Sequence, residues 1–117
     1  MYDGRGGDDL FLFAANHFVR ETVSGQAGTD TARFTGSNNL SYSALDVERI
    51  EFAGALTLTF DDGFGGANYE FTIIGDANVN RIKISVPDGD RFDFSRIGFQ
   101  SWSATADTVT INGSSSN

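Results

Sequence analysis

The sequence predicts an all-β protein made of one domain, and three observations support this prediction. Gly, Ser, Thr, Asn and Asp are frequent throughout, whereas the helix-favouring Lys, Glu, Gln and Met are scarce. Apolar residues alternate with polar ones in short runs, and clusters of turn-forming residues separate these runs. Leu, Ile, Val and Phe contribute 30 of the 117 residues, which is enough for a packed core in a chain of this length.

Nine short runs are predicted to form strands. The clearest are residues 56–60 and 81–86, where apolar side chains occupy every second position. Only residues 43–51 offer a helical alternative, because Leu45, Glu48 and Phe52 would share one helix face, although the same segment also fits an extended run. The predicted strands are residues 10–13, 18–23, 32–35, 49–52, 56–60, 69–74, 81–86, 91–94 and 108–112.

Charge and composition exclude several classes of function. Sixteen acidic and eight basic residues give a formal net charge of −8, and twelve of the acids are Asp. We expect no nucleic-acid partner, because the chain lacks the cationic surface that binds a phosphate backbone. No apolar run approaches the length of a membrane span, and the absence of Cys excludes disulfides and thiolate metal sites. Such a chain can attract cations, for which Asp supplies hard oxygen ligands.

Two similar segments near the N-terminus form the clearest motif. Residues 3–11 (DGRGGDDLF) and 25–33 (GQAGTDTAR) both fit the pattern G-G-x-G-x-D-x-U-x, in which U is a larger apolar residue. Asp8 and Asp30 take the Asp position and lie 22 residues apart. Weaker copies place Asn80 and Asp107 at the same position, so the pattern recurs along the chain with an uneven step.

The pattern resembles the RTX, or haemolysin-type, calcium-binding repeat of secreted bacterial proteins. The sequence departs from that family because its step is not two nonapeptides and its Gly content falls after residue 36. The resemblance implies a parallel β-roll or β-solenoid, and the step predicts about five coils with turns near residues 6, 28, 54, 78 and 105. An antiparallel β-sandwich is the alternative architecture, and Asp61-Asp62-Gly63 could insert a local hairpin.

The resemblance also implies a calcium site between the turns of adjacent coils. Asp8 and Asp30 are the expected carboxylate ligands, and Asp107 is a further candidate. Calcium takes six to eight oxygen ligands and accepts backbone carbonyls among them. The carbonyls expected to complete the shell belong to Gly4, Gly6, Gln26 and Gly28. The apolar eighth position of each copy is expected to point into the core, and these positions are Leu10, Ala32, Ile82 and Val109.

The resulting prediction is a non-catalytic, calcium-binding structural module. It would belong to a longer secreted or cell-surface bacterial protein such as an adhesin, stack against neighbouring repeats, and fold on binding calcium outside the cell. Among twelve Asp residues no pair is specific enough to indicate catalysis, so no catalytic residue is assigned. One alternative is a carbohydrate-binding or polysaccharide-processing β-domain. Another is a self-associating filament or lattice unit, because the ends of a solenoid expose unpaired strand edges.

Overall fold

The computed structural model describes residues 2–16, 22–40, 44–61, 71–86, 97–103 and 105–113, and every regular element within these ranges is a β-strand. The prediction of an all-β fold is confirmed. The strands are short because turn-forming residues end each apolar run after a few residues. They are β1 (Tyr2–Asp3), β2 (Leu10–Phe13), β3 (Thr22–Ser24), β4 (Thr31–Phe34), β5 (Asn38–Asn39), β6 (Ala44–Asp46), β7 (Arg49–Phe52), β8 (Thr57–Asp61), β9 (Phe71–Ile74), β10 (Arg81–Val86), β11 (Ile97–Gln100) and β12 (Thr108–Gly113).

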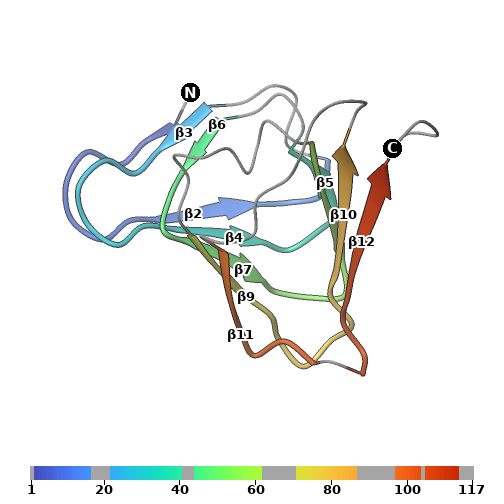
Figure 1. The fold of residues 1–117 in the computed structure, drawn as a ribbon. Helices are drawn as coiled ribbons and strands as arrows, with labels where there is room; N and C mark the ends of the chain where they lie inside the picture. The colour runs from blue at the N-terminus through green and yellow to red at the C-terminus, as the bar shows by residue number, and fades with distance from the viewer. Residues whose placement is uncertain are drawn as a thin grey trace.

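The strands form three sheets around one core (Figure 1). Sheet 1 has the order β1-β3-β6, sheet 2 the order β2-β4-β7-β9-β11, and sheet 3 the order β5-β8-β10-β12. Neighbours within a sheet are therefore one coil apart along the chain. Every strand pairing in the described segments is parallel, so the fold is a β-solenoid and not an antiparallel sandwich.

The solenoid has about three turns, fewer than the five expected. Sheet 2 nevertheless joins strands from five successive passes of the chain, which are called the first to the last coil here whether or not they contribute to every sheet. The three sheets are unequal, since sheet 2 has five strands, sheet 3 four and sheet 1 three. Within the described residues, only β3-β4-β5 and β6-β7-β8 place a strand of every sheet in one coil. The step between paired residues is also uneven, because Thr31 pairs with Arg49 whereas Arg81 pairs with the more distant Thr108. A count of recurring turns therefore overestimates the number of complete coils.

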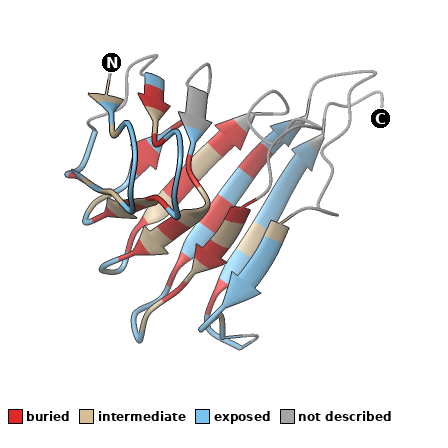
Figure 2. Cartoon of the chain, turned by 90° about the vertical axis from the view of Figure 1, so that its left-hand side faces the viewer, coloured by how far each residue is buried: buried red, intermediate tan, exposed pale blue. Residues whose placement is uncertain are grey.

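Buried residues alternate with more exposed ones along many of the strands (Figure 2). The pairing registers place the inward residues of successive coils in rows along the solenoid axis. In-register parallel pairing places equivalent residues above one another, so each row collects similar side chains. The rings of Phe13 and Phe34 lie 5.3 Å apart in one such row. Two of the inward rows of sheet 2 are Phe11-Ala32-Ile50-Ile73-Phe99 and Phe13-Phe34-Phe52, and Phe71 and Ile97 form a third in the later coils.

The apolar eighth position of the repeat points into the core in the three later copies, as predicted, but not in the first copy. Ala32 and Ile82 are buried, and Val109 packs against the core. Leu10 instead lies on the outer face and is 50% exposed, while Phe11 takes the inward position. Successive side chains of a strand point to opposite faces, so an error of one residue in the repeat frame exchanges inside and outside.

Residues 43–51 contain two strands, so the helical alternative is wrong. β6 and β7 occupy this segment, separated by Val47 and Glu48, and both pair with the preceding coil. β11 is a strand that the patterns do not predict, because Gly98 interrupts its apolar run. The strand predicted at residues 91–94 lies outside the described residues. Of the hairpin turn predicted at Asp61-Asp62-Gly63, only Asp61 is described, as the last residue of β8.

The register of the first coils can be tested by truncating one inward and one outward side chain. Phe34 is fully buried between Phe13 and Phe52, so Phe34→Ala should lower the free energy of unfolding by about 3–5 kcal/mol. Leu12 is 63% exposed, so Leu12→Ala should change it by less than about 0.5 kcal/mol. Urea unfolding followed by circular dichroism measures both. Equal losses in the two variants would contradict the assigned register.

Candidate functional site

The turn that leads from sheet 1 into sheet 2, called here the first corner, has the same conformation in the first two coils. It comprises residues 4–9 and 25–30, which share the pattern Gly-x-x-Gly-x-Asp. Arg5 and Gln26 have φ angles of 71° and 68°, and Gly7 and Gly28 have φ angles of 95° and 131°. The left-handed region is open to Gly and costly for other residues, so the backbone of these turns requires Gly7 and Gly28.

Register at the first corner places Asp9, and not Asp8, opposite Asp30. Asp9 immediately precedes Leu10, Asp30 immediately precedes Thr31, and these two neighbours are paired. The true step between the two turns is therefore one residue shorter than the motif indicates. In the third coil Glu48 takes the same position, because the next residue, Arg49, pairs with Thr31. The first corner thus stacks three acids, Asp9, Asp30 and Glu48, which we call the acidic column.

Side-chain oxygens of the acidic column accept backbone hydrogens from the coil before. The Asp9 N–H donates to Asp30 Oδ1 at 2.9 Å, and the Asp30 N–H donates to Glu48 Oε2 at 2.7 Å. In the opposite direction, the Thr29 N–H donates to Asp8 Oδ1 at 2.8 Å. Asp8 therefore holds the two turns together from the solvent side, while Asp30 does so from within.

Two carboxylate oxygens of the acidic column take no part in these hydrogen bonds. Asp9 Oδ2 and Asp30 Oδ2 are buried, and neither has a hydrogen-bond partner among the described residues. Each lies against the glycine that opens its own turn, since a Cβ built on Gly4 or Gly25 would come within 2.4 or 2.0 Å of that oxygen. A buried carboxylate oxygen without a partner is costly, so this is where a cation would be most stabilising.

The residues whose carbonyls are the other predicted ligands all belong to the two stacked turns. Gly6 pairs with Ala27 in a parallel bridge, and the Gln26 side chain donates to Asp3, so it does not point toward the acidic column. Gly4 and Gly28 lie in the same stacked turns. In the described part of the chain no three His, Cys, Asp or Glu side chains come together as a metal-binding group. A cation here would depend on the two Asp carboxylates and on carbonyl oxygens or water for the rest of its shell.

Asp107 lies at a different corner, so the structure does not bring it together with Asp8 and Asp30. This second corner leads from sheet 2 into sheet 3 and includes Asn80 one coil earlier. Asp107 Oδ1 accepts the Asn80 N–H at 2.8 Å and Oδ2 accepts the Ser103 N–H at 2.7 Å. Both carboxylate oxygens are therefore satisfied, unlike those of Asp9 and Asp30. The single repeat frame predicted for all four copies is wrong, because two corners with similar sequences contribute to it.

Asp76 anchors the second corner and was not predicted from the motif. It accepts hydrogen bonds from the Gly54 N–H, the Asn78 N–H and side-chain amide, and the Asn80 side-chain amide, at 2.7–3.0 Å. Partial burial raises the pKa of Asp76, but the hydrogen bonds from Asn80, Asn78 and Gly54 together lower it below its ordinary value of 3.8. Its Asp-x-Asn spacing in the sequence is the signal of an Asx turn.

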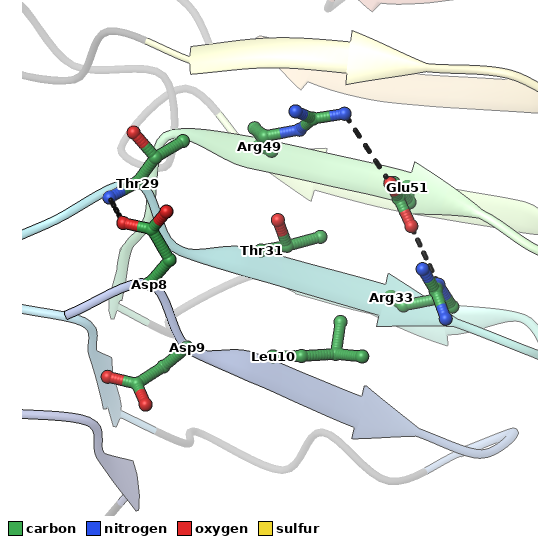
Figure 3. Close-up of a pocket in the computed structure, with 8 residues that line it drawn as sticks. All are labelled: Asp8, Asp9, Leu10, Thr29, Thr31, Arg33, Arg49 and Glu51. Atoms are coloured by element: carbon green, nitrogen blue, oxygen red, sulfur yellow. Dashed lines mark hydrogen bonds and ion pairs between the residues drawn. The ribbon is translucent and has the colours of Figure 1, made fainter.

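Beside the first corner, the outer face of sheet 2 carries a shallow polar pocket of about 330 Å³ (Figure 3). Glu51 lies between two guanidinium groups, with Arg33 Nε at 2.6 Å and an Arg49 terminal nitrogen at 3.6 Å. Arg49 Nε is buried and has no hydrogen-bond partner in the described segments. Asp8, Asp9 and Thr29 form the opposite side of the pocket, so the first corner and the sheet face meet there.

Comparison with known proteins adds no family to this geometry, because neither family models, nor curated proteins, nor solved structures match the chain. No helix in the described ranges has the length and apolar character needed to cross a membrane.

The fit between Asp30 and Gly25 can be tested with alanine at two glycines of the first corner. Gly25→Ala should lower the free energy of unfolding by about 1–3 kcal/mol, because its Cβ would displace the Asp30 carboxylate from a fully buried position. Gly6→Ala is the matched control, since a Cβ there meets nothing within 4 Å, and its effect should stay within about 0.5 kcal/mol. Urea unfolding measures both. A Gly25→Ala variant as stable as Gly6→Ala would contradict the close contact.

Asp76 should contribute an acid-sensitive part of the stability. Because its pKa is lower in the folded chain than in the unfolded chain, its contribution is complete above the unfolded value near 3.8 and is lost as the pH falls through the folded value. The Asp76→Asn variant should therefore have a lower free energy of unfolding than the wild type at about pH 5, and this loss should become smaller as the pH is lowered to about 3. The measurement is the free energy of unfolding in urea across this range. A loss of unfolding free energy that stays the same across this pH range would show that the folded state does not favour the charged form of Asp76.

Proposed function

We propose that this chain is a calcium-stabilised structural module, with the ion held at the first corner between Asp9 and Asp30. The observation that carries the proposal is the pair of buried carboxylate oxygens, Asp9 Oδ2 and Asp30 Oδ2, that occupy equivalent positions of adjacent coils and lack partners among the described residues. Asp9 replaces Asp8 as the first carboxylate ligand, because the register pairs Asp9 with Asp30. Asp8 stays on the solvent side of the same turns.

Local electrostatics support a cation at this position. Both arginines of the neighbouring pocket, Arg33 and Arg49, have Glu51 as their ion-pair partner, and no ion pair with Asp9 or Asp30 is found in the described segments. The acidic column therefore places like charges in consecutive coils of a chain whose net charge is already −8. Repulsion of this kind opposes the compact state, and a bound cation would remove it.

Calcium suits the donor set better than other metals. The chain offers no thiolate and has a single His in its sequence, so soft or imidazole-based sites are disfavoured. Calcium accepts backbone carbonyls, such as those of Gly4, Gly6, Gln26 and Gly28, and tolerates irregular coordination, whereas magnesium requires a tighter octahedral shell. The resemblance of residues 3–11 and 25–33 to calcium-binding RTX repeats supports the same choice.

Binding would couple to folding, because the two carboxylates come together only when the first two coils are in register. An ion at about 100 times its dissociation constant stabilises the folded state by about 2.7 kcal/mol. Extracellular calcium modules have dissociation constants of about 0.1–1 mM, a range that leaves them empty in a calcium-poor cytoplasm. The proposal thus includes a non-catalytic role in a secreted or cell-surface protein that becomes rigid outside the cell, with neighbouring repeats as its partners.

A carbohydrate-binding role is the second candidate, and the buried, unpartnered Arg49 Nε favours it. Arg49 separates the 330 Å³ pocket from a second pocket of about 210 Å³ that Thr72 and Gln100 also line. Together they form a polar surface with both donors and acceptors, which is the chemistry that sugar hydroxyls require. Retardation of the chain in native gels containing a neutral polysaccharide, lost in Arg49→Ala, would support this role.

The calcium proposal is tested by removing one charge at each corner. In wild-type protein, calcium at about ten times its dissociation constant should stabilise the fold by about 1.4 kcal/mol, which raises the melting temperature by about 5 °C. Asp30→Asn should abolish this rise, because it removes the charge whose Oδ2 has no partner. Asp107→Asn is the matched control and should keep the rise, since both Asp107 oxygens are held by backbone donors.

Thermal unfolding followed by circular dichroism, with and without calcium, measures all three proteins. Magnesium at the same concentration controls for ionic strength and should raise the melting temperature less. An unchanged melting temperature of the wild type in calcium, or an equal rise in Asp30→Asn, would overturn the proposal.

A further inference from the structure

The outer face of sheet 3 carries a regular array of hydroxyl, amide and basic side chains. Sheet 3 lies on the side of the solenoid opposite the first corner (Figure 1). Because its strands pair in register, alternate residues form rows, with neighbours in a row about 4.8 Å apart and the rows about 6.6 Å from each other. The rows are Thr57-Arg81-Thr108, Asn39-Thr59-Lys83-Thr110 and Asp61-Ser85-Asn112.

Two cations of this array are available to a ligand. Arg81 and Lys83 are exposed, and neither has an ion-pair partner among the described residues, whereas both arginines of sheet 2 pair with Glu51. The one acid in the three rows is Asp61, whose register neighbour is a serine. The rows thus hold twice as many basic as acidic residues, the reverse of the ratio in the whole chain.

A polar pocket of about 210 Å³ adjoins the two cations. Both threonines that line it are register neighbours of the cations, so the pocket and the cations share one surface. None of the described residues that line it is charged or apolar, and their hydroxyl and amide groups suit the hydroxyls of a sugar. The lining residues are Asn16, Ser37, Asn38, Asn39, Thr57 and Thr59.

We propose that the outer face of sheet 3 binds an acidic polysaccharide, with Arg81 and Lys83 binding its carboxylates and the polar pocket binding sugar hydroxyls. Charge complementarity identifies the ligand as acidic. A guanidinium donates two parallel hydrogen bonds to a carboxylate, and a Lys ammonium adds a point charge. A sparsely charged, carboxylate-bearing polymer fits better than a densely sulfated one, because repulsion by a chain of net charge −8 grows with the charge density of the ligand.

Other acidic macromolecules fit this face less well. A protein partner requires apolar or aromatic anchors, and the three rows contain none. Single-stranded nucleic acid stacks its bases on aromatic side chains, and a duplex needs many cations along its backbone. The surface is also separate from the acidic column and from Arg49, which belong to the first corner and to sheet 2. The inference therefore does not rest on the proposed calcium site.

Affinity electrophoresis in native gels containing carboxymethyl dextran tests the proposal, with unmodified dextran as the uncharged control polymer. Wild-type protein should bind carboxymethyl dextran at least about tenfold more tightly than dextran, and the difference should shrink as added salt screens the charges. Arg81→Gln combined with Lys83→Gln should raise the Kd at least about tenfold, because the two changes remove charge-assisted hydrogen bonds. Lys83→Arg keeps the charge and should retain most of the affinity.

Two further variants separate a built site from a general effect of charge. Arg5→Gln is the matched control, since it removes an exposed positive charge at the first corner and installs the residue type that Gln26 provides in the next coil. It should leave the Kd unchanged. Thr59→Val removes a hydroxyl of the pocket without a change in charge and should weaken binding to carboxymethyl dextran. Thermal unfolding followed by circular dichroism establishes that each variant is folded.

Three results would overturn the proposal. They are equal wild-type affinity for the two dextrans, an equal loss of affinity in Arg5→Gln and Lys83→Gln, and a Thr59→Val variant that binds as the wild type does. Retardation by dextran sulfate without retardation by carboxymethyl dextran would also contradict the assigned ligand. A folded Asp30→Asn variant should bind carboxymethyl dextran as the wild type does, so failure of this proposal and failure of the calcium proposal are distinguishable.

Discussion

Hydrogen bonding between successive coils is the interaction on which the rest of this structure depends. Each described strand takes its backbone partners from the coil before or after it, as β4 does from β2 and β7, so no strand is completed by its immediate neighbours in sequence. In-register parallel pairing then places like residues above like residues, as in the row Phe13-Phe34-Phe52. The core is a consequence of this register, because a shift of one residue would bring the exposed Leu12 inward and turn Phe13 toward solvent.

The corners are where the backbone ladder is interrupted, and acidic side chains continue it there. Asp30, Glu48 and Asp107 each accept a backbone N–H of the preceding coil, so a buried donor is satisfied where no carbonyl is positioned to do so. One oxygen of each carboxylate is enough for this role. What distinguishes the two corners is the second oxygen, which has a backbone donor in Asp107 and none among the described residues in Asp30.

The acidic column ends after the third coil. Phe71 and Ile97 take the position of Glu48 in the two later coils, as shown by the pairing of the residues that follow them. An apolar core position replaces a polar one, so the later coils are held by burial of hydrophobic surface and by the second corner. This division explains why a cation would matter for the first coils, whose turns carry the carboxylates.

Sequence alone determined the all-β class and most of the longer strands of this protein. Alternating residues such as those of 81–86 dictate strands, turn-forming clusters dictate where they end, and the acidic composition restricts what the chain can bind. It also drew attention to the two turns that stack at the first corner, in which Gly7 and Gly28 have backbone angles that other residues adopt at a cost.

Tertiary structure decided the register and everything that follows from it. Asp8 and Asp9 are adjacent in sequence and chemically identical, and only the pairing of Leu10 with Thr31 selects Asp9 as the partner of Asp30. Asp107 and Asp30 have similar surroundings in sequence but lie at different corners. The role of Asp76 depends on Gly54, which belongs to the preceding coil. The physical reason is that which N–H meets which carbonyl across coils is settled by the packing of the whole core, and no local sequence pattern contains that information.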